Sequence, residues 1–161
     1  MCAPRSIALA VILAAVAPSA ARADEQLAVA AGFAEALSVP ATAHLGAYPF
    51  AALALVVPAG RCAVVPSVGV EYAPDTGHWG FLATVVVDTP VSKAVGVDVI
   101  VSLAHDQPGA RWDDAAFAAG GGFGLSITTA PAVVSPSLLF YADVASGALS
   151  VSPGVSVARV F

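Results

Sequence analysis

Apolar and polar positions alternate with a period of two along most of this chain. In the segment 94–104, valines fill the odd positions from Val95 to Val101, and Gly96, Asp98 and Ile100 fall between them. Alternation of this kind is typical of β-strands whose two faces meet different surroundings. Six segments carry the pattern clearly, namely 62–73, 79–88, 94–104, 117–129, 133–143 and 149–161.

Two further segments near the N-terminus are predicted to add strands. Residues 47–57 end in an alternating Leu-x-Leu-x-Val pattern. Residues 25–38 suit a strand, in which Leu27 and Phe33 share a face with a misplaced Glu35, but their alanines and leucine spacing also suit a helix. Because bacterial barrels have even strand numbers, seven clear strands favour an eighth at 25–38.

The length and composition of these segments indicate a membrane rather than water. The segments run roughly 10–14 residues, whereas transmembrane strands need about 9–11 and soluble strands about 5–6. Mean hydropathy is +0.86 and only 11% of residues are charged, against about 25% in soluble domains. Beyond the N-terminal segment, no run of 18 apolar residues occurs. The sequence therefore predicts an all-β, antiparallel, up-and-down transmembrane barrel of eight strands.

Residues 1–23 have the features of a cleaved signal peptide. Arg5 precedes an apolar run at 7–17, and Ala21-Arg22-Ala23 forms an A-x-A cleavage site. The predicted mature domain is 24–161, which retains the single cysteine Cys62 and so has no internal disulfide. The net charge of the whole chain is −5, and the few basic residues are scattered. We therefore expect no nucleic acid as a partner.

With these features the chain resembles the small eight-stranded bacterial outer-membrane β-barrel family, typified by OmpX and the membrane domain of OmpA. The signal peptide, the strand count and the terminal Phe161, preceded by Val155 and Val157, carry the resemblance. It implies a bacterial outer-membrane location, contact with outer-membrane lipid, and recognition of the C-terminal strand by the barrel-assembly machinery. Arg159 departs from the hydrophobic residue usual at that position, and a long arginine side chain can extend to the membrane interface.

The order of the strands predicts which connections meet at each end of the barrel. With a periplasmic N-terminus, the connections near 58–61, 89–93 and 129–132 are periplasmic. The connections near 39–46, 74–78, 105–116 and 144–148 are then external, where barrel loops are longer. Five aromatic residues near the outer strand ends are predicted to form an interfacial girdle: Tyr48, Tyr72, Trp79, Phe81 and Phe140.

The opposite face of the strands is predicted to point inward and is mostly Gly, Ala, Ser and Thr. Three carboxylates, Glu71, Asp88 and Asp98, share this face, and Lys93 or Arg61 could reach Asp88. Three larger residues depart from the pattern of small inward side chains, namely Val65, Val86 and Ile100. Since eight strands enclose a space that side chains normally fill, we predict no pore.

Candidate chemistry is sparse. His44, His78 and His105 all fall in predicted external connections, but their neighbours form no recognisable ligand set, and no serine adjoins them. The glycine run 120–122 lacks the Lys-Ser/Thr and helix of a phosphate loop, and is better interpreted as a curved strand. We therefore assign no catalytic, cofactor-binding or metal-ligating residue and expect no cofactor.

Three functions remain open at this point. The first is a non-enzymatic outer-membrane barrel with a structural or surface-interaction role in the cell envelope. The second is a soluble exported β-barrel or sandwich that binds an apolar ligand, with the large side chains inside. The third is a barrel enzyme that acts on envelope lipid.

The predicted topology places the connection 105–116 at the cell surface, because it is the longest and contains a Pro-Gly pair and several acids. An epitope tag inserted after Gly109 should therefore be detected by antibody on intact cells. Detection only after the cells are permeabilised would reverse the topology.

Overall fold

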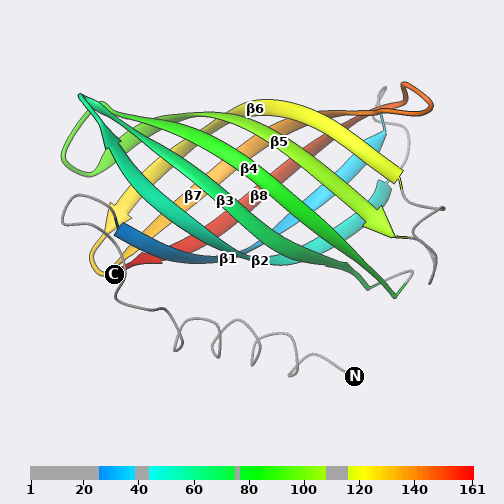
Figure 1. The fold of residues 1–161 in the computed structure, drawn as a ribbon, viewed down its shortest axis with the longest axis horizontal. Helices are drawn as coiled ribbons and strands as arrows, with labels where there is room; N and C mark the ends of the chain where they lie inside the picture. Colours follow the sequence, from blue (N-terminus) through cyan, green and yellow to red (C-terminus); the bar gives the residue numbers. More distant parts are fainter. Residues whose placement is uncertain (1–25, 39–43, 75–76, 108–115) are drawn as a thin grey trace.

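The computed structural model describes residues 26–38, 44–74, 77–107 and 116–161, and the predicted signal peptide at 1–23 lies outside them. The described chain forms one antiparallel sheet that closes on itself as a barrel (Figure 1). Its strands are β1 (Gln26–Ser38), β2 (His44–Ala59), β3 (Cys62–Ala73), β4 (His78–Pro90), β5 (Val95–Gln107), β6 (Ala116–Thr129), β7 (Ala132–Asp143) and β8 (Leu149–Val160). The predicted fold class is confirmed.

The barrel closes where the first strand meets the last. β1 pairs with β8 from Ala28 opposite Val160 to Ser38 opposite Ser150, and every other strand pairs with its neighbours in sequence. The ambiguous N-terminal segment is therefore a strand, as the parity of strand numbers favoured. Among the described residues, no helix is long and apolar enough to cross a membrane.

The connections differ in length between the two ends of the barrel. Short turns at 60–61, 91–94 and 130–131 lie at the end where β1 begins and β8 finishes. The strand ends that flank the connections 39–43, 74–77, 108–115 and 144–148 lie at the opposite end, as predicted, and all of these connections except 74–77 have more residues than any of the three turns. β2 begins earlier than predicted, at His44, and β5 continues to Gln107 instead of ending at residue 104. Pairing of β5 with both β4 and β6 carries the strand past the predicted boundary.

The alternating positions of the sequence form the outer and the inner face of the barrel. Large apolar side chains point outward and stay exposed, such as Val68 at 64%, Val101 at 61% and Phe123 at 65%. The residues between them point inward, and Ser102, at 1% exposed, is the most deeply buried of those described. The predicted inward carboxylates and the three larger inward residues all line the interior. The predicted faces of the strands are therefore confirmed.

Several large inward side chains lie over a glycine of the adjacent strand. Phe50 is the strand partner of Gly32, and a Cβ built on that glycine would come within 2.6 Å of the phenyl ring. Tyr141 is likewise the partner of Gly120, whose Cβ would lie 2.5 Å from Cδ1 of the tyrosine ring. Two of the aromatic rings in the narrow interior thus lie where the neighbouring strand has no side chain.

This packing predicts a difference between two adjacent glycines of β6. Gly120→Ala should lower the stability of the folded barrel, because the new methyl group meets the Tyr141 ring and the carbonyl oxygen of Phe140. Gly121→Ala is the matched control: it points outward, and the nearest atom to its Cβ is the Ile100 carbonyl oxygen at 3.0 Å. Urea unfolding from lipid vesicles should show the larger loss for Gly120→Ala, and equal losses would refute the packing account.

Candidate functional site

The outer surface of the barrel is an apolar band with aromatic residues near one end. Trp79 and Phe81 are each 49% exposed and Phe140 is 51% exposed, and the Tyr72 and Trp79 rings pack with their centroids 4.8 Å apart. Tyr48 was wrongly assigned to this girdle, because it lines the interior instead. Its even position in β2 gives it the opposite face from the outward Leu53 and Leu55.

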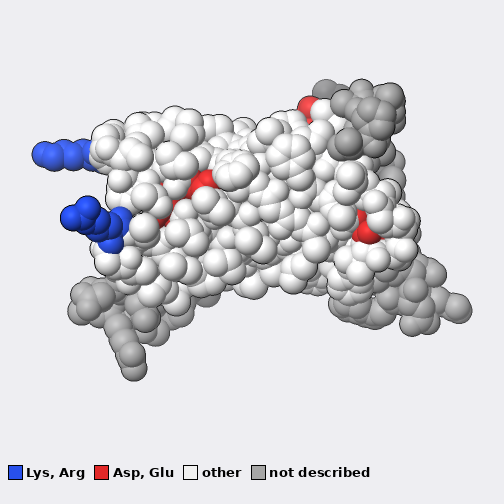
Figure 2. Space-filling model, turned by 90° about the horizontal axis from the view of Figure 1, so that it is seen from above, with Lys and Arg blue, Asp and Glu red and all other residues white. Residues whose placement is uncertain are grey.

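The described basic residues gather at the short-turn end of the barrel. Arg61 and Lys93 lie in the turns after β2 and β4, and Arg159 lies near the end of β8. Figure 2 shows the Lys and Arg side chains of one face together at a single end. The Arg159 guanidinium lies over the Phe161 ring, 5.2 Å from its centroid. This cation–π contact explains how a charged residue is held near the C-terminus of the barrel.

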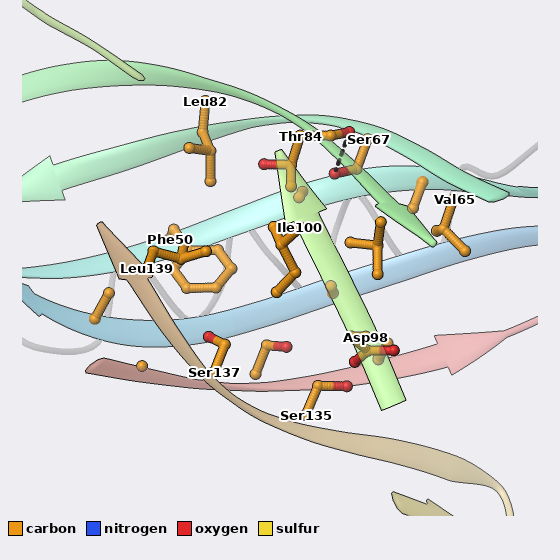
Figure 3. Close-up of a pocket in the computed structure, with 18 of the residues that line it drawn as sticks. Phe50, Val65, Ser67, Leu82, Thr84, Asp98, Ile100, Ser135, Ser137 and Leu139 are labelled. Atoms are coloured by element: carbon orange, nitrogen blue, oxygen red, sulfur yellow. Dashed lines mark hydrogen bonds between the residues drawn. The ribbon is translucent and has the colours of Figure 1, made fainter. Parts of the chain in front are cut away.

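The interior holds a cavity of about 420 Å³. Its lining extends along the barrel, from Ala28 and Val160 at the short-turn end to Tyr48 and Ser150 near the other end. Figure 3 shows Phe50, Leu82, Ile100 and Leu139 among the side chains that line it. The expectation of a filled interior was therefore wrong. The physical reason is the large share of Ala, Ser and Gly on the inward face, whose side chains are too small to meet across the barrel.

A hydrogen-bonded polar network crosses one wall of this cavity. The Tyr141 hydroxyl donates to Oγ of Ser102 over 3.0 Å, and Oγ of Ser102 lies 3.4 Å from Oγ1 of Thr84. Ser67 reaches the backbone oxygen of Thr84 at 3.5 Å (Figure 3). These hydroxyl groups satisfy one another, so the network joins strands β3, β4, β5 and β7 across the interior.

Two carboxyl groups face the cavity nearer the short-turn end. Asp88 of β4 and Asp98 of β5 are direct strand partners, and both line the cavity. Ser126 donates a hydrogen bond of 2.9 Å to Oδ1 of Asp88. Gly96 makes room for this bond, since its Cβ would collide with Oδ1 of Asp88 and Oγ of Ser126. Within the described residues, Asp88 is thus bonded to Ser126 rather than to Lys93 or Arg61.

Asp98 is the more enclosed of the two carboxyl groups. Its side chain is 4% exposed, and its Oδ1 atom has no hydrogen-bond partner among the described residues. The alternation of the sequence predicts that both aspartates point inward, but it does not predict that they are strand partners. The available signal was their equal distance from Lys93, the centre of the hairpin, which makes them opposite residues of β4 and β5.

The three histidines lie in strands and not in connections. His44 opens β2, although its side chain lies outside the described structure, and His78 opens β4. His105 lies within β5, only 6% exposed, with its ring 4.6 Å from that of Phe117 in an edge-on arrangement. Phe81 is the strand partner of His105, so the backbone at His78 is roughly 10 Å further along β4.

The positions of the histidines decide whether they can form a metal site with other side chains. Within the described residues, no group of three or more His, Cys, Asp or Glu side chains could hold a metal ion. The glycine run 120–122 lies within β6, as the strand interpretation required. The lumen, with its cavity and its pair of carboxyl groups, is therefore the candidate site that the fold builds.

Several solved structures of outer-membrane barrel proteins match this fold. The N-terminal β-barrel domain of Pseudomonas aeruginosa OprF matches with a TM-score of 0.58 and 13% identity, covering 84% of this chain and 97% of that one. Neisserial surface protein A matches with a TM-score of 0.53 and 12% identity, covering 86% of this chain and 98% of that one. Ail, the attachment invasion locus protein of Yersinia pestis, matches with a TM-score of 0.52 and 8% identity, covering 85% and 97%.

These comparisons confirm the fold-level resemblance to eight-stranded outer-membrane barrels. At such identities the likeness is one of fold. Neither a family model nor a curated protein matches the sequence.

The apolar band predicts how a charge is tolerated at different depths. Val101 lies at the middle of β5 and is 61% exposed, so Val101→Arg should destabilise a barrel in lipid by about 2–4 kcal/mol. Val91→Arg is the control, because Val91 is equally open at 65% but lies in a turn beyond the strands. Urea unfolding in vesicles should show a large loss for Val101→Arg alone. Equal tolerance of both substitutions would mean that lipid does not cover the middle of β5.

Proposed function

We propose that the mature chain is an integral, non-enzymatic β-barrel protein of a bacterial outer membrane, with a structural or surface-interaction role in the cell envelope. The observation that carries this proposal is the closed barrel with large apolar side chains on its outside. In lipid, such a surface is buried and every strand has a partner on both sides, so that no backbone edge meets hydrocarbon.

The soluble alternative requires the opposite arrangement of side chains. A soluble barrel buries its large apolar residues and exposes its small polar ones. Here Phe123, Val101 and Leu103 are each more than half exposed, while Ser102, Ser126 and Ser152 are buried. A sandwich would need two separate sheets, whereas the eight strands form a single closed one. These features favour the membrane-spanning form.

Two features support a role in contacts at the cell surface. The longer connections lie together at one end of the barrel, and loops positioned by a rigid scaffold are common sites of binding. One protein of the same fold is an attachment invasion locus protein, and another is a surface protein. Those descriptions belong to those proteins, and the surface role of this chain is a proposal.

The C-terminal strand also has the features expected of an assembly signal. Phe161 is 51% exposed and its amide donates a hydrogen bond of 2.8 Å to the Leu27 carbonyl, which ties the chain end to β1. The exposed ring lies under the Arg159 guanidinium. We propose that this end of β8 is what the barrel-assembly machinery recognises.

The absence of catalysis rests on the arrangement of the histidines. His105 is enclosed near Phe81 and Phe117, and the backbone of His78 lies well away from it. An enzyme that acts on envelope lipid needs a nucleophile and a base within hydrogen-bond reach. We therefore expect the lipid A of cells that produce the protein to have the same mass spectrum as that of cells without it. A new lipid A species would favour the enzymatic alternative.

The proposal is tested by locating the protein in cells. The mature chain should sediment with outer membranes, resist carbonate extraction, and change its gel mobility when the detergent-solubilised sample is heated, because a closed barrel resists dodecyl sulfate until it is boiled. The Val101→Arg variant should yield less of the unheated, folded band. Recovery of most of the wild-type protein in the soluble periplasm would overturn the proposal.

A further inference from the structure

The cavity in the lumen has the size and lining of a small-molecule site. Ligand pockets usually measure about 300–1,000 Å³ and are mostly apolar with a few polar groups, and this one measures about 420 Å³. Alanines of β1 and β2 supply one wall, including Ala30, Ala52 and Ala54, and Ile100 and Leu139 stand on the other side (Figure 3). Such a lining favours a hydrocarbon body over a hydrated one.

The polar groups of the cavity differ in whether they have hydrogen-bond partners. The hydroxyls of Tyr141, Ser102 and Thr84 bond to one another. Asp98 differs, because it is 4% exposed and its Oδ1 atom has no hydrogen-bond partner among the described residues. A buried carboxylate without a partner is costly. Among the described residues that line the cavity, Asp98 therefore has a carboxyl oxygen that lacks a donor, which a ligand could supply.

Because Asp98 lies opposite Asp88, the donor that suits this position should also carry a positive charge. Directly opposed like charges destabilise an antiparallel pair, since the two Cβ atoms are only about 4.5–5.5 Å apart. A cation between the two carboxylates would reverse this effect. The described basic residues do not supply it, because Arg61 and Lys93 are exposed in turns and Arg159 lies over Phe161 on the outside.

We propose that the lumen binds an amphiphilic amine, with its ammonium group between Asp88 and Asp98 and its hydrocarbon body in the apolar cavity. An ammonium group has three donors, which suit two carboxyl groups that face each other on adjacent strands. An anionic amphiphile is repelled by the same carboxylates. A neutral one fills the cavity but leaves the two charges unmatched. This site is independent of the surface role proposed above.

The proposal is tested with three probes of one chain length: decylammonium, decanol and decyl sulfate. Binding is measured by calorimetry on the folded barrel in phosphatidylcholine nanodiscs, with empty nanodiscs subtracted to remove partition into lipid. Decylammonium should bind about tenfold or more tightly than decanol, because hydrogen bonds to charged groups are the stronger ones. Decyl sulfate should bind least. Equal affinities for the amine and the alcohol would overturn the role of the carboxylates.

Variants separate the charge from the cavity. Asp98→Asn should bring the affinity for decylammonium closer to that for decanol, since only Asp88 then remains charged, and should leave decanol binding unchanged. Ala52→Phe should abolish binding of both, because its ring can lie over Gly69, its strand partner, and fill the lumen. Ala51→Phe is the matched control, since Ala51 points outward. This variant should bind decylammonium and decanol as the wild type does. Equal binding by the Ala52→Phe and Ala51→Phe variants would place the ligand outside the lumen and overturn the proposal.

A measurement on the wild-type protein tests the lumen site without any variant, so that it does not depend on whether a variant folds. Ile100 is the inward neighbour of Asp98 on β5 and lines the cavity. Its methyl resonances should shift on addition of decylammonium, whereas those of the outward Val99 should not. Unshifted Ile100 methyl groups at saturating amine would refute the lumen site even if the barrel is folded and correctly located.

Discussion

The closure of β1 onto β8 is the constraint on which the rest of the structure depends. In hydrocarbon, an unpaired backbone amide or carbonyl costs several kcal/mol, so a sheet can cross a membrane only when it has no edge. The pairing from Ala28–Val160 to Ser38–Ser150 removes the two edges that eight strands would otherwise expose. Once the sheet is closed, successive side chains point alternately to the lipid and to the interior.

Closure also limits what the interior can hold. Eight strands enclose little space, and the chain meets this limit with small inward residues and with glycines beneath the large ones. Gly32 accommodates Phe50, Gly120 accommodates Tyr141, and Gly96 allows Ser126 to reach Asp88. The remaining side chains are too short to fill the centre, and the result is a cavity of about 420 Å³ that two aspartates and a hydroxyl network face. The same residues that make the barrel fit together thus make the cavity.

Much of the fold could be predicted from the sequence because lipid and lumen impose opposite side-chain sizes on alternating positions. The segment 62–73 carries this signal at most of its positions, and its strand bounds and faces were predicted correctly. Tyr48 was misplaced although its even position in β2 already implied the inner face. His105 was assigned to a connection because a polar residue next to Asp106 resembles a loop, whereas pairing with Phe81 and Phe117 extends the strand.

The candidate site was harder to predict, since alternation gives the face of a residue but not its partner. The pairing of Asp88 with Asp98 depends on register, which the turn at 91–94 sets. The cavity depends on the summed volume of side chains from all eight strands, and no local segment of sequence contains that sum. The hydrogen bond from Tyr141 to Ser102 likewise joins strands that are not neighbours, across the glycine at position 120.

The central claim is that odd residues of β5 meet lipid while even ones meet the lumen. Nuclear Overhauser effects between lipid acyl-chain protons and side-chain methyl groups test it most directly, on the unaltered protein in phosphatidylcholine nanodiscs. We expect cross-peaks from the acyl chains to the methyl groups of Val99 and Val101, and none to those of Ile100. Cross-peaks to Ile100 with none to the two valines would contradict it.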